Sequence, residues 1–220
     1  MKEDRLVIAI DGPAAAGKST IAKEISKRLN IEYIDTGAMY RALTLKMINN
    51  NIDMEDIEKI IEIANSTSIK FKNNSIYLDD VIVDEEIRKN IVNNHVSNVA
   101  KIKEVRQIMV MIQREMAQHS NIIMDGRDIG TVVLPHANYK FFLIASVEER
   151  ARRRYLEIQK KGEETISYKR ILEEITVRDT IDSTRDVSPL KKAIDAYEID
   201  TTDKTIEETI VEIISIIEGR

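Results

Sequence analysis

Hydrophobic and polar positions along the chain follow two periods. Short apolar runs are typical of buried strands, and longer stretches with apolar residues every three or four positions are typical of amphipathic helices. The predicted strands are residues 6–10, 31–34, 122–124, 140–145 and 197–199. The predicted helices are residues 21–29, 38–49, 102–119, 148–161 and 168–181. This alternation predicts an α/β fold with a five-stranded parallel sheet flanked by helices.

Two helix starts carry a capping-box pattern, in which a hydroxyl and a carboxylate three residues later satisfy each other's backbone N–H groups. Ser146 with Glu149, and Thr205 with Glu208, have this spacing. The pattern predicts that a helix begins at each of these two points.

One segment departs from the alternation of strands and helices. The runs 69–71, 76–78 and 81–83 are rich in β-forming residues, and the turn-forming residues 72–75 and 79–80 separate them. Such short connections predict a small antiparallel sheet. We interpret it as an insert in the larger fold.

A glycine-containing loop follows the first predicted strand and leads directly into a helix. It has the Walker A pattern, whose backbone N–H groups cradle phosphate oxygens. Lys18 is expected to reach the β- and γ-phosphates, and Ser19 to hold Mg²⁺. The alternative is a turn with an incidental Lys-Ser pair, which the flanking strand and helix disfavour. The residues expected to bind the donor nucleotide here are Gly12, Pro13, Ala14, Ala15, Ala16, Gly17, Lys18, Ser19 and Thr20.

Polar side chains gather after the second and third predicted strands. The run 35–41 contains a carboxylate, a hydroxyl and an arginine, and the run 125–131 contains two carboxylates and an arginine. Ligands in such folds bind beyond the carboxyl ends of the strands. Asp125 is a candidate to orient Mg²⁺ through water, as a Walker B carboxylate does. The alternative is that both runs are charged surface turns.

Two later helices carry charged residues at helical spacing. The basic residues that share a face of the helix at 148–161 are Arg150, Arg153 and Arg154. This face indicates either a solvated surface or a lid that closes on the triphosphate. Arg178, Asp182 and Arg185 form one stripe if the next helix continues that far, and the alternative is a simple helical salt bridge.

The composition excludes several function classes. The formal net charge is −5, which disfavours a protein that coats nucleic acid. The chain has no cysteine, which excludes a disulfide scaffold and is compatible with the cytoplasm, the location that we expect. No apolar run approaches the roughly 18 residues of a membrane span, and none at the start suits a signal peptide. We therefore expect no nucleic-acid or membrane partner.

Together these motifs resemble the cytidylate kinase family from end to end. The resemblance rests on the phosphate loop, Asp-Thr-Gly-Ala-Met-Tyr-Arg at 35–41, Gly-Arg-Asp-Ile-Gly-Thr at 126–131, Arg-Asp-Thr-Ile-Asp-Ser-Thr-Arg at 178–185 and Ser-Pro-Leu at 188–190. There are two small departures. Three alanines occupy 14–16 where the family often has a glycine, and Ser188 stands where alanine is common.

The resemblance implies a monomeric kinase that transfers phosphate from ATP to CMP or dCMP with Mg²⁺ as cofactor. Ser97, Arg106 and Asp128 fall where the family reads the edge of cytosine. The other residues expected to bind the acceptor are Asp35, Thr36, Gly37, Tyr40, Arg41, Arg127, Arg178, Asp182 and Arg185. The lid arginines expected to bind ATP are Arg150, Arg153 and Arg154. The residues expected to take part in catalysis are Lys18, Arg127, Arg178 and Arg185.

The same resemblance divides the single kinase domain into functional regions. The core is expected at 1–36, 85–147 and 187–220. The monophosphate-binding region is expected at 37–84, with its β insert at about 67–83, and the lid at about 148–186.

The residues allow phosphoryl transfer without a catalytic base. The second pKa of a nucleoside monophosphate is about 6, so its attacking oxygen is largely ionised at pH 7. The remaining obstacle is repulsion between two anions, which positioning and cations overcome. We expect in-line transfer, with Lys18 on the donor and arginines on the acceptor, including Arg41. Asp128 would accept from the exocyclic amine of cytosine, which uracil lacks, so UMP should be disfavoured.

Two alternatives remain open at this point. One is another small P-loop kinase, for UMP, AMP, dephospho-coenzyme A or a hydroxylated metabolite, and the arginine-rich acceptor side argues against a hydroxyl acceptor. The other is a non-catalytic nucleotide sensor or a partner-binding module. The intact Lys18–Ser19 pair argues against that second alternative.

Overall fold

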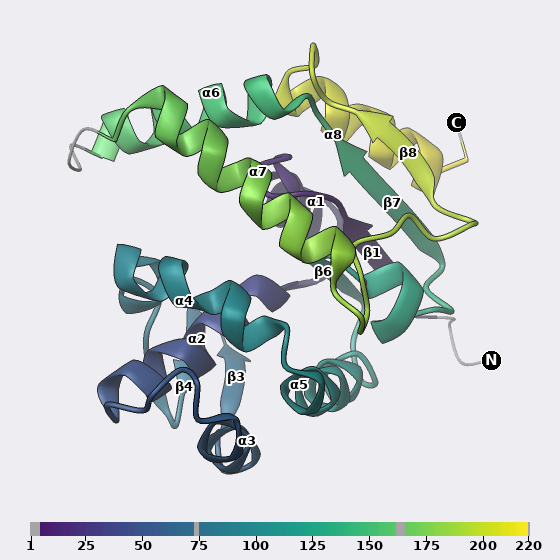
Figure 1. The fold of residues 1–220 in the computed structure, drawn as a ribbon. Coiled ribbons are helices and arrows are strands. Elements are labelled where there is room, and N and C mark those ends of the chain that lie inside the picture. The colour runs from purple at the N-terminus through teal and green to yellow at the C-terminus, as the bar shows by residue number, and fades with distance from the viewer. Residues whose placement is uncertain (1–4, 73–74, 162–165, 220) are drawn as a thin grey trace. The chain divides into compact units, whose positions relative to one another are not determined.

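The computed structural model describes residues 5–72, 75–161 and 166–219, and they form an α/β fold (Figure 1). By their contacts they divide into two compact units. The first unit comprises the chain up to residue 32 and from residue 121 onward, and the second comprises residues 33–120. Residues 85–120, which we expected in the core, group with the second unit. The functional regions assigned from the sequence remain predictions.

The main sheet has five strands in the order β2-β6-β1-β7-β8. The strands are β1 (Val7–Asp11), β2 (Glu32–Asp35), β6 (Ile122–Gly126), β7 (Tyr139–Ile144) and β8 (Tyr197–Asp200). Neighbours from β6 to β8 pair in parallel, with Ile10 of β1 opposite both Asp125 of β6 and Phe141 of β7. The predicted α/β fold with a five-stranded parallel sheet is confirmed. Apolar residues of β1 and its neighbours, such as Ile8 and Phe141, are fully buried, so this sheet forms the core of the first unit.

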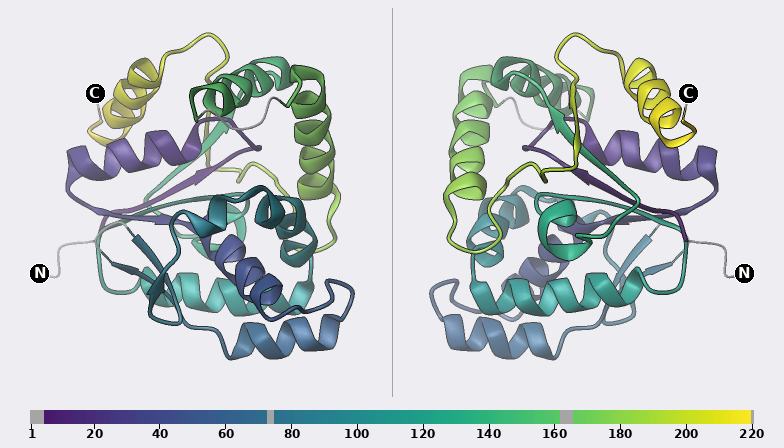
Figure 2. Two further views of the ribbon diagram at one scale, coloured as in Figure 1. Left: turned by 90° about the vertical axis from the view of Figure 1, so that its left-hand side faces the viewer. Right: turned by 90° about the vertical axis from the view of Figure 1, so that its right-hand side faces the viewer.

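The helices of the first unit are α1 (Lys18–Leu29), α6 (Val147–Lys161), α7 (Tyr168–Thr184) and α8 (Ile206–Ile217). Helix α8, yellow in Figure 2, lies beside α1, which is purple. Helices α6 and α7 pack together through buried Ala151, Ile158, Ile171 and Ile175. No helix in the described part of the chain is long and apolar enough to cross a membrane.

The second unit combines helices with a small antiparallel sheet. Its helices are α2 (Thr36–Asn49), α3 (Ile57–Asn65), α4 (Asn90–Ala100) and α5 (Lys103–Met116). Its strands are β3 (Ile69–Lys72), β4 (Ser75–Leu78) and β5 (Val81–Ile82), in that order. The predicted antiparallel sheet is confirmed, with Phe71 opposite Ile76 and Tyr77 opposite Ile82. The centre of the predicted turn, residues 73–74, lies outside the described residues. Helices α3 and α4 were not predicted.

One of the two predicted capping boxes is complete. The Thr205 hydroxyl accepts from the Glu208 N–H, and the Glu208 carboxylate accepts from the Thr205 N–H, at the start of α8. The other predicted helix start is confirmed, because α6 begins at Val147, but only half of its capping box forms. Ser146 Oγ accepts from the Glu149 N–H at 3.2 Å, but the Ser146 N–H donates to Thr202 Oγ1 at 3.1 Å. The Glu149 carboxylate is instead bound by two arginines, which offer stronger, charged hydrogen bonds.

Candidate active site

The phosphate loop connects the end of β1 to the start of α1. Gly12 has φ +150°, and a Cβ there would lie 2.1 Å from the carbonyl oxygen of Leu143, so only glycine fits. Gly17 closes the loop with φ 88° and precedes the first residue of α1. Ala15 adopts φ 59°, although its Cβ disfavours the left-handed region. The backbone is therefore folded tightly against β7, as a loop that cradles phosphate requires.

Lys18, the first residue of α1, is buried beside this loop. Its Nζ donates to the carbonyl oxygen of Pro13 at 2.8 Å. Burial and the charge of Arg127 lower the pKa of Lys18 to about 7, although the charge of Asp125 acts in the opposite direction. A phosphate anion beside Nζ would favour the ammonium form. The lysine therefore gains its full positive charge where the donor phosphates are expected.

Ser19 and Asp125 lie together at the same edge of the sheet. Ser19 Oγ donates to Asp125 Oδ2 at 2.8 Å. A hydroxyl and a carboxylate are the hard oxygen ligands that suit Mg²⁺, which also keeps waters and substrate phosphates. Within the described ranges, no group of three or more His, Cys, Asp or Glu side chains could hold a metal. The residues present therefore fit a Mg²⁺ ion that arrives with its nucleotide better than a metal held by the protein alone.

Two arginines and two carboxylates of the first unit form a chain of ion pairs. Arg127 Nε donates to Asp182 Oδ2 at 2.8 Å. Arg185 lies 3.5 Å from Asp182 Oδ1 through Nη1 and 3.8 Å from Asp128 Oδ1 through Nη2. Burial alone would raise the pKa of Asp182, but the charges of Arg127, Arg178 and Arg185 outweigh it and hold that pKa below its ordinary value. This part of the first unit can bind anions while the Asp182 carboxylate stays ionised at neutral pH.

Arg178, Asp182 and Arg185 were predicted to share one face of a helix, but α7 ends one residue before Arg185. The helix stops at Thr184, and Arg185 has the extended angles φ −64° and ψ 143°. Its side chain still reaches Asp182, and its Nε donates to the carbonyl oxygen of Ser188 at 2.7 Å. Ser188 has φ 51°, a left-handed turn that brings this carbonyl back toward the helix end.

The three arginines predicted as a lid have different partners. Arg150 Nη1 donates to the carbonyl oxygen of Ala14 in the phosphate loop at 3.1 Å and to Asp179 Oδ2 at 2.5 Å. Arg154 pairs with Glu157 on its own helix at 2.8 Å. The structure thus brings Arg150 to the loop, whereas Arg154 is held along α6.

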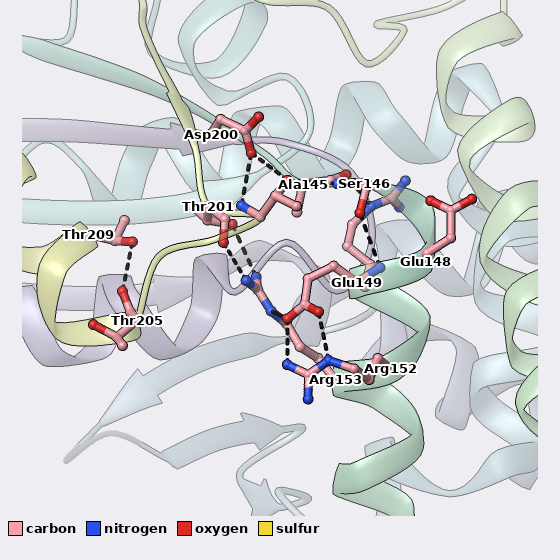
Figure 3. A network of polar contacts seen from close by, with 12 residues as sticks. Ala145, Ser146, Glu148, Glu149, Arg152, Arg153, Asp200, Thr201, Thr205 and Thr209 are labelled. Carbon is pink, nitrogen blue, oxygen red and sulfur yellow. Dashed lines mark hydrogen bonds and ion pairs between the residues drawn. The ribbon is translucent and has the colours of Figure 1, made fainter.

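Arg153 belongs to a polar network between α6 and the segment after β8 (Figure 3). It donates to the side chain of Thr201 at 3.1 Å and also to the Thr201 carbonyl oxygen. It also donates to Glu149, which accepts from Arg152 as well. Hydrogen bonds from Arg152 and Arg153 hold the pKa of Glu149 below its ordinary value, against the opposing effect of burial. A Cβ at Gly17 would lie 4.0 Å from Arg153 Nη1, so this guanidinium also lies near the loop.

In the second unit, Asp35 organises the start of α2. Its Oδ1 accepts from the Ala38 N–H at 2.8 Å and caps the helix. Its Oδ2 lies 3.4 Å from Arg88 and 3.8 Å from Arg41. A Cβ at Gly37 would lie 3.1 Å from Asp35 Oδ1 and 3.4 Å from an Arg41 Nη atom, so glycine makes room for this approach. Arg41 is thereby held at the N-terminal end of α2.

The residues expected to read cytosine from the second unit lie on α4 and α5. Arg106 is buried, its Nη1 donates to the carbonyl oxygen of Ala100 at 3.0 Å, and its guanidinium lies 5.4 Å from the centroid of the Tyr40 ring. Ser97 is half-buried on α4, and Thr36 is buried in the first turn of α2. Tyr40 and Arg106, predicted separately, are thus brought into contact.

Sequence reasoning missed three polar residues that the structure places among the predicted ones. Asp179 contacts the phosphate loop, Arg88 contacts Asp35, and Asp11 is a buried carboxylate beside Gly12. Burial raises the pKa of Asp11 to about 7, although the N–H groups of Gly130 and Ile129 oppose the shift. An acidic residue that ends an apolar buried strand is an unusual sequence feature and could have identified Asp11. Asp179 and Arg88 carry no comparable signal.

The strand, phosphate loop and helix at β1–α1, set in a parallel sheet, define a P-loop fold of the kind found in small-molecule kinases. A shikimate kinase from Acinetobacter baumannii in complex with shikimate has this fold, with a TM-score of 0.52 and 15% identity over 99% of this chain and 95% of that chain. The family model for cytidylate kinase matches residues 8–219. The chain belongs to the cytidylate kinase family, as its motifs predicted.

Two relatives illustrate the match. The cytidylate kinase of Clostridioides difficile (strain 630) is 57% identical over 96% of this chain and 97% of its own length. The cytidylate kinase of Caldanaerobacter subterraneus subsp. tengcongensis is 56% identical over 92% of this chain and 90% of its own length. The similarity therefore extends over both units.

Proposed function

We propose that this protein transfers the γ-phosphate of ATP to CMP or dCMP and releases ADP with CDP or dCDP. The family membership supports the reaction. The observation that carries the chemistry is the position of Lys18 in the phosphate loop next to the charges of Arg127 and Arg178. A lysine in such a loop suits a triphosphate, and neighbouring arginines suit a second anionic group.

The donor would be held by the loop amides, Lys18 and the hydroxyl of Ser19. Helix α1 begins at Lys18, so its positive end points at the same phosphates. Ser19 and Asp125 would hold Mg²⁺, which when bound neutralises charge on the β- and γ-phosphates. The contact between Ser19 and Asp125 supports this assignment because it already joins the two oxygen ligands.

The acceptor phosphate would be bound by Arg127, Arg178 and Arg185 of the first unit, and the binding role expected of Arg41 from the sequence stays a prediction. Their carboxylate partners, among them Asp182, hold these cations in place. A phosphate oxygen would replace part of these contacts with stronger charge-assisted hydrogen bonds. The acceptor needs no general base because its phosphate is already ionised at neutral pH.

The arginines of α6 would act on the triphosphate in two ways. Arg150 reaches the loop through the carbonyl oxygen of Ala14 and can order it directly. Arg153 and Arg154 would add positive charge after breaking their present ion pairs with Glu149 and Glu157. Closure of α6 over the triphosphate would exclude water. It would thereby favour transfer of the phosphate to the acceptor over hydrolysis of ATP.

The family resemblance assigns the reading of cytosine to Ser97, Arg106 and Asp128, and each of these assignments stays a prediction of its own. Arg106 can donate to the carbonyl oxygen of the base, and its contact with Tyr40 supports this role because it fixes the guanidinium plane. Asp128 can accept from the exocyclic amine. UMP would leave that carboxylate unpaired and should be a poor acceptor. The monomeric state and the cytoplasmic location expected from the sequence stay predictions.

A coupled assay of ADP release tests this function. Purified protein receives ATP and Mg²⁺ with CMP, dCMP, UMP, AMP, GMP or no acceptor. CMP and dCMP should give the highest kcat/KM, and Lys18→Ala should abolish turnover. Lys27→Ala is the matched control because Lys27 is an exposed lysine of the same helix that pairs only with Glu24 among the described residues. Preference for another acceptor would show that the base is misassigned, and tight ATP binding without any turnover would refute the kinase reaction.

A further inference from the structure

Asp11, the last residue of β1, is a buried carboxylate that uses both of its oxygens. Its side chain lies immediately before Gly12, and only 4% of the residue is exposed. Oδ1 accepts from the Ile129 N–H at 2.8 Å, and Oδ2 accepts from the Gly130 N–H at 2.7 Å. These partners are 118 and 119 residues away along the chain. One side chain therefore joins the start of the phosphate loop to a distant turn.

The turn that Asp11 holds is a single π-helical turn, Ile129–Val133. Ile129, Gly130 and Val133 are buried, so their N–H groups need acceptors. Asp11 supplies acceptors for the first two, and the carbonyl oxygen of Asp128 accepts from Val132 at 2.8 Å and Val133 at 3.1 Å. The turn thus depends on two acidic residues, one through its carboxylate and the other through its backbone.

The space around Gly130 shows how closely the chain segments approach. A Cβ at Gly130 would lie 3.2 Å from Lys140 Cδ and 3.4 Å from Asp11 Oδ2. The Lys140 ammonium does not neutralise Asp11 in this arrangement, because it donates to Asp195 at 2.7 Å and to the Pro135 carbonyl oxygen at 2.6 Å. The carboxylate of Asp11 is therefore bound by backbone amides rather than by this ammonium.

The anchored turn directly follows Arg127 and Asp128, two residues of the proposed acceptor site. Arg127 reaches Asp182, and Asp128 lies 3.8 Å from Arg185. The direction of both side chains depends on the position of the backbone at Arg127 and Asp128. Asp11 fixes that position through its hydrogen bonds to the next two residues, Ile129 and Gly130. We propose that Asp11 is a positioning residue that holds Arg127 and Asp128 in register with the phosphate loop. This inference rests on the proposed kinase function, because it gives those two residues their role.

The variant Asp11→Asn separates positioning from simple packing. It keeps the size of the side chain, but its NH₂ group would face one of the two backbone N–H groups, so one hydrogen bond is lost. Leaving a buried backbone N–H without its acceptor corresponds to roughly a 10- to 100-fold effect. We expect kcat/KM for CMP to fall by about this factor, while the Kd for ATP, measured by titration calorimetry, changes less than about threefold.

Two further variants keep the test decisive. Glu198→Gln is the matched control, because Glu198 is an exposed carboxylate of β8 whose ion-pair partner is Lys192, a residue that forms no hydrogen bond with Asp11 or the turn in the described part of the chain. It should leave both constants unchanged. Gly130→Ala keeps the Asp11 carboxylate but crowds its contact with the turn, because the added Cβ would lie 3.4 Å from Asp11 Oδ2 and 3.2 Å from Lys140 Cδ. It should lower kcat/KM for CMP in the same direction if Asp11→Asn does not fold.

Hydrogen exchange provides a readout that needs no turnover. In Asp11→Asn the amides of Ile129 and Gly130 should exchange at least about tenfold faster than in the wild-type protein, while those of α1 stay protected. Unchanged exchange, unchanged kcat/KM for CMP, or an equal loss of ATP binding would each overturn the proposal. If the wild-type protein used no nucleoside monophosphate, the proposed function would fail, and the exchange experiment would still decide whether Asp11 holds the turn.

Discussion

Arg150 Nη1 lies 2.5 Å from Asp179 Oδ2, and this ion pair joins α6 and α7 to the phosphate loop. The two side chains bind opposite ends of one residue, since Asp179 Oδ1 accepts from the Ala14 N–H at 3.3 Å and Arg150 donates to the Ala14 carbonyl oxygen. A cation and an anion thus clamp a single residue of the loop. The conformation of the loop and the docking of both helices should depend on the same pair.

The first prediction concerns the stability that this pair provides. Arg150→Met and Asp179→Asn should each lower the free energy of unfolding by about 1–3 kcal/mol, because each leaves a partly buried charged partner with fewer hydrogen bonds. The double variant should lose less unfolding free energy than the sum of the two single losses, because neither charged side chain then remains without its partner. Urea unfolding measures all three values. Arg152→Ala, which removes only an exposed pair with Glu149, is the control and should stay within about 0.5 kcal/mol. Fully additive losses would contradict the coupling.

The second prediction concerns Mg²⁺. Asp125→Asn should raise the Mg²⁺ concentration needed for half-maximal activity and lower kcat by about 10- to 100-fold, because the residue that orients the Ser19 hydroxyl and the ion loses its charge. Initial rates at increasing Mg²⁺ and fixed ATP measure both effects. Binding of ATP in the presence of a chelator should be nearly unchanged. A Mg²⁺ dependence identical to that of the wild-type protein would rule out this assignment.

The third prediction is a pH dependence of stability. The arginines around Asp182 hold its folded-state pKa below the ordinary value of 3.8, so its ionised form stabilises the folded protein. This contribution is fully present above about pH 4 to 5 and disappears as the pH falls through the lower, folded-state pKa. Asp182→Asn should therefore be less stable than the wild-type protein at pH 7, and the difference should shrink below pH 4. Denaturant unfolding at several pH values measures it, and a difference that grows toward acid pH would refute the assignment.

The fourth prediction compares two glycines with positive φ. Gly12→Ala should destabilise the protein by about 2–4 kcal/mol and abolish ATP binding, because its Cβ would collide with the carbonyl oxygen of Leu143. Gly219 has φ +69°, and a Cβ there would have nothing within 4 Å, so Gly219→Ala should cost only about 1 kcal/mol of backbone strain. Thermal unfolding and ATP titration of both variants provide the measurement. Equal losses would show that the clash with β7 is unimportant.

The sequence predicted the elements whose local pattern is strong. All five strands of the main sheet lie within one or two residues of their predicted bounds, because apolar runs flanked by turn residues leave little freedom of register. Helix α4 was missed although Val92, Val96 and Val99 are buried at helical spacing. Its asparagines and histidine favour turns over helices, and packing within the second unit overrides that preference.

Contacts between distant segments were beyond sequence reasoning. The spacing of Arg150 and Arg153 correctly predicts that both lie on α6, but their partners Asp179 and Thr201 come from segments 29 and 48 residues away. The helix predicted after Ser146 does begin there, but the second half of its capping box is missing because Thr202, 56 residues away, accepts from the Ser146 N–H. The double contact of Asp11 with the turn after Arg127 likewise exists only once the chain is folded.

Strand β5 has a consequence for how copies of the protein behave toward one another. It is an edge strand of only two residues, and Val81 and Ile82 are 64% and 51% exposed. An apolar edge of this kind can recruit a strand from a neighbouring chain, but acidic residues stand at both ends, at 79–80 and 84–86. The short length limits the hydrogen bonds that a visiting strand could form. Removing that charge or lengthening the strand would turn this edge into a starting point for aggregation.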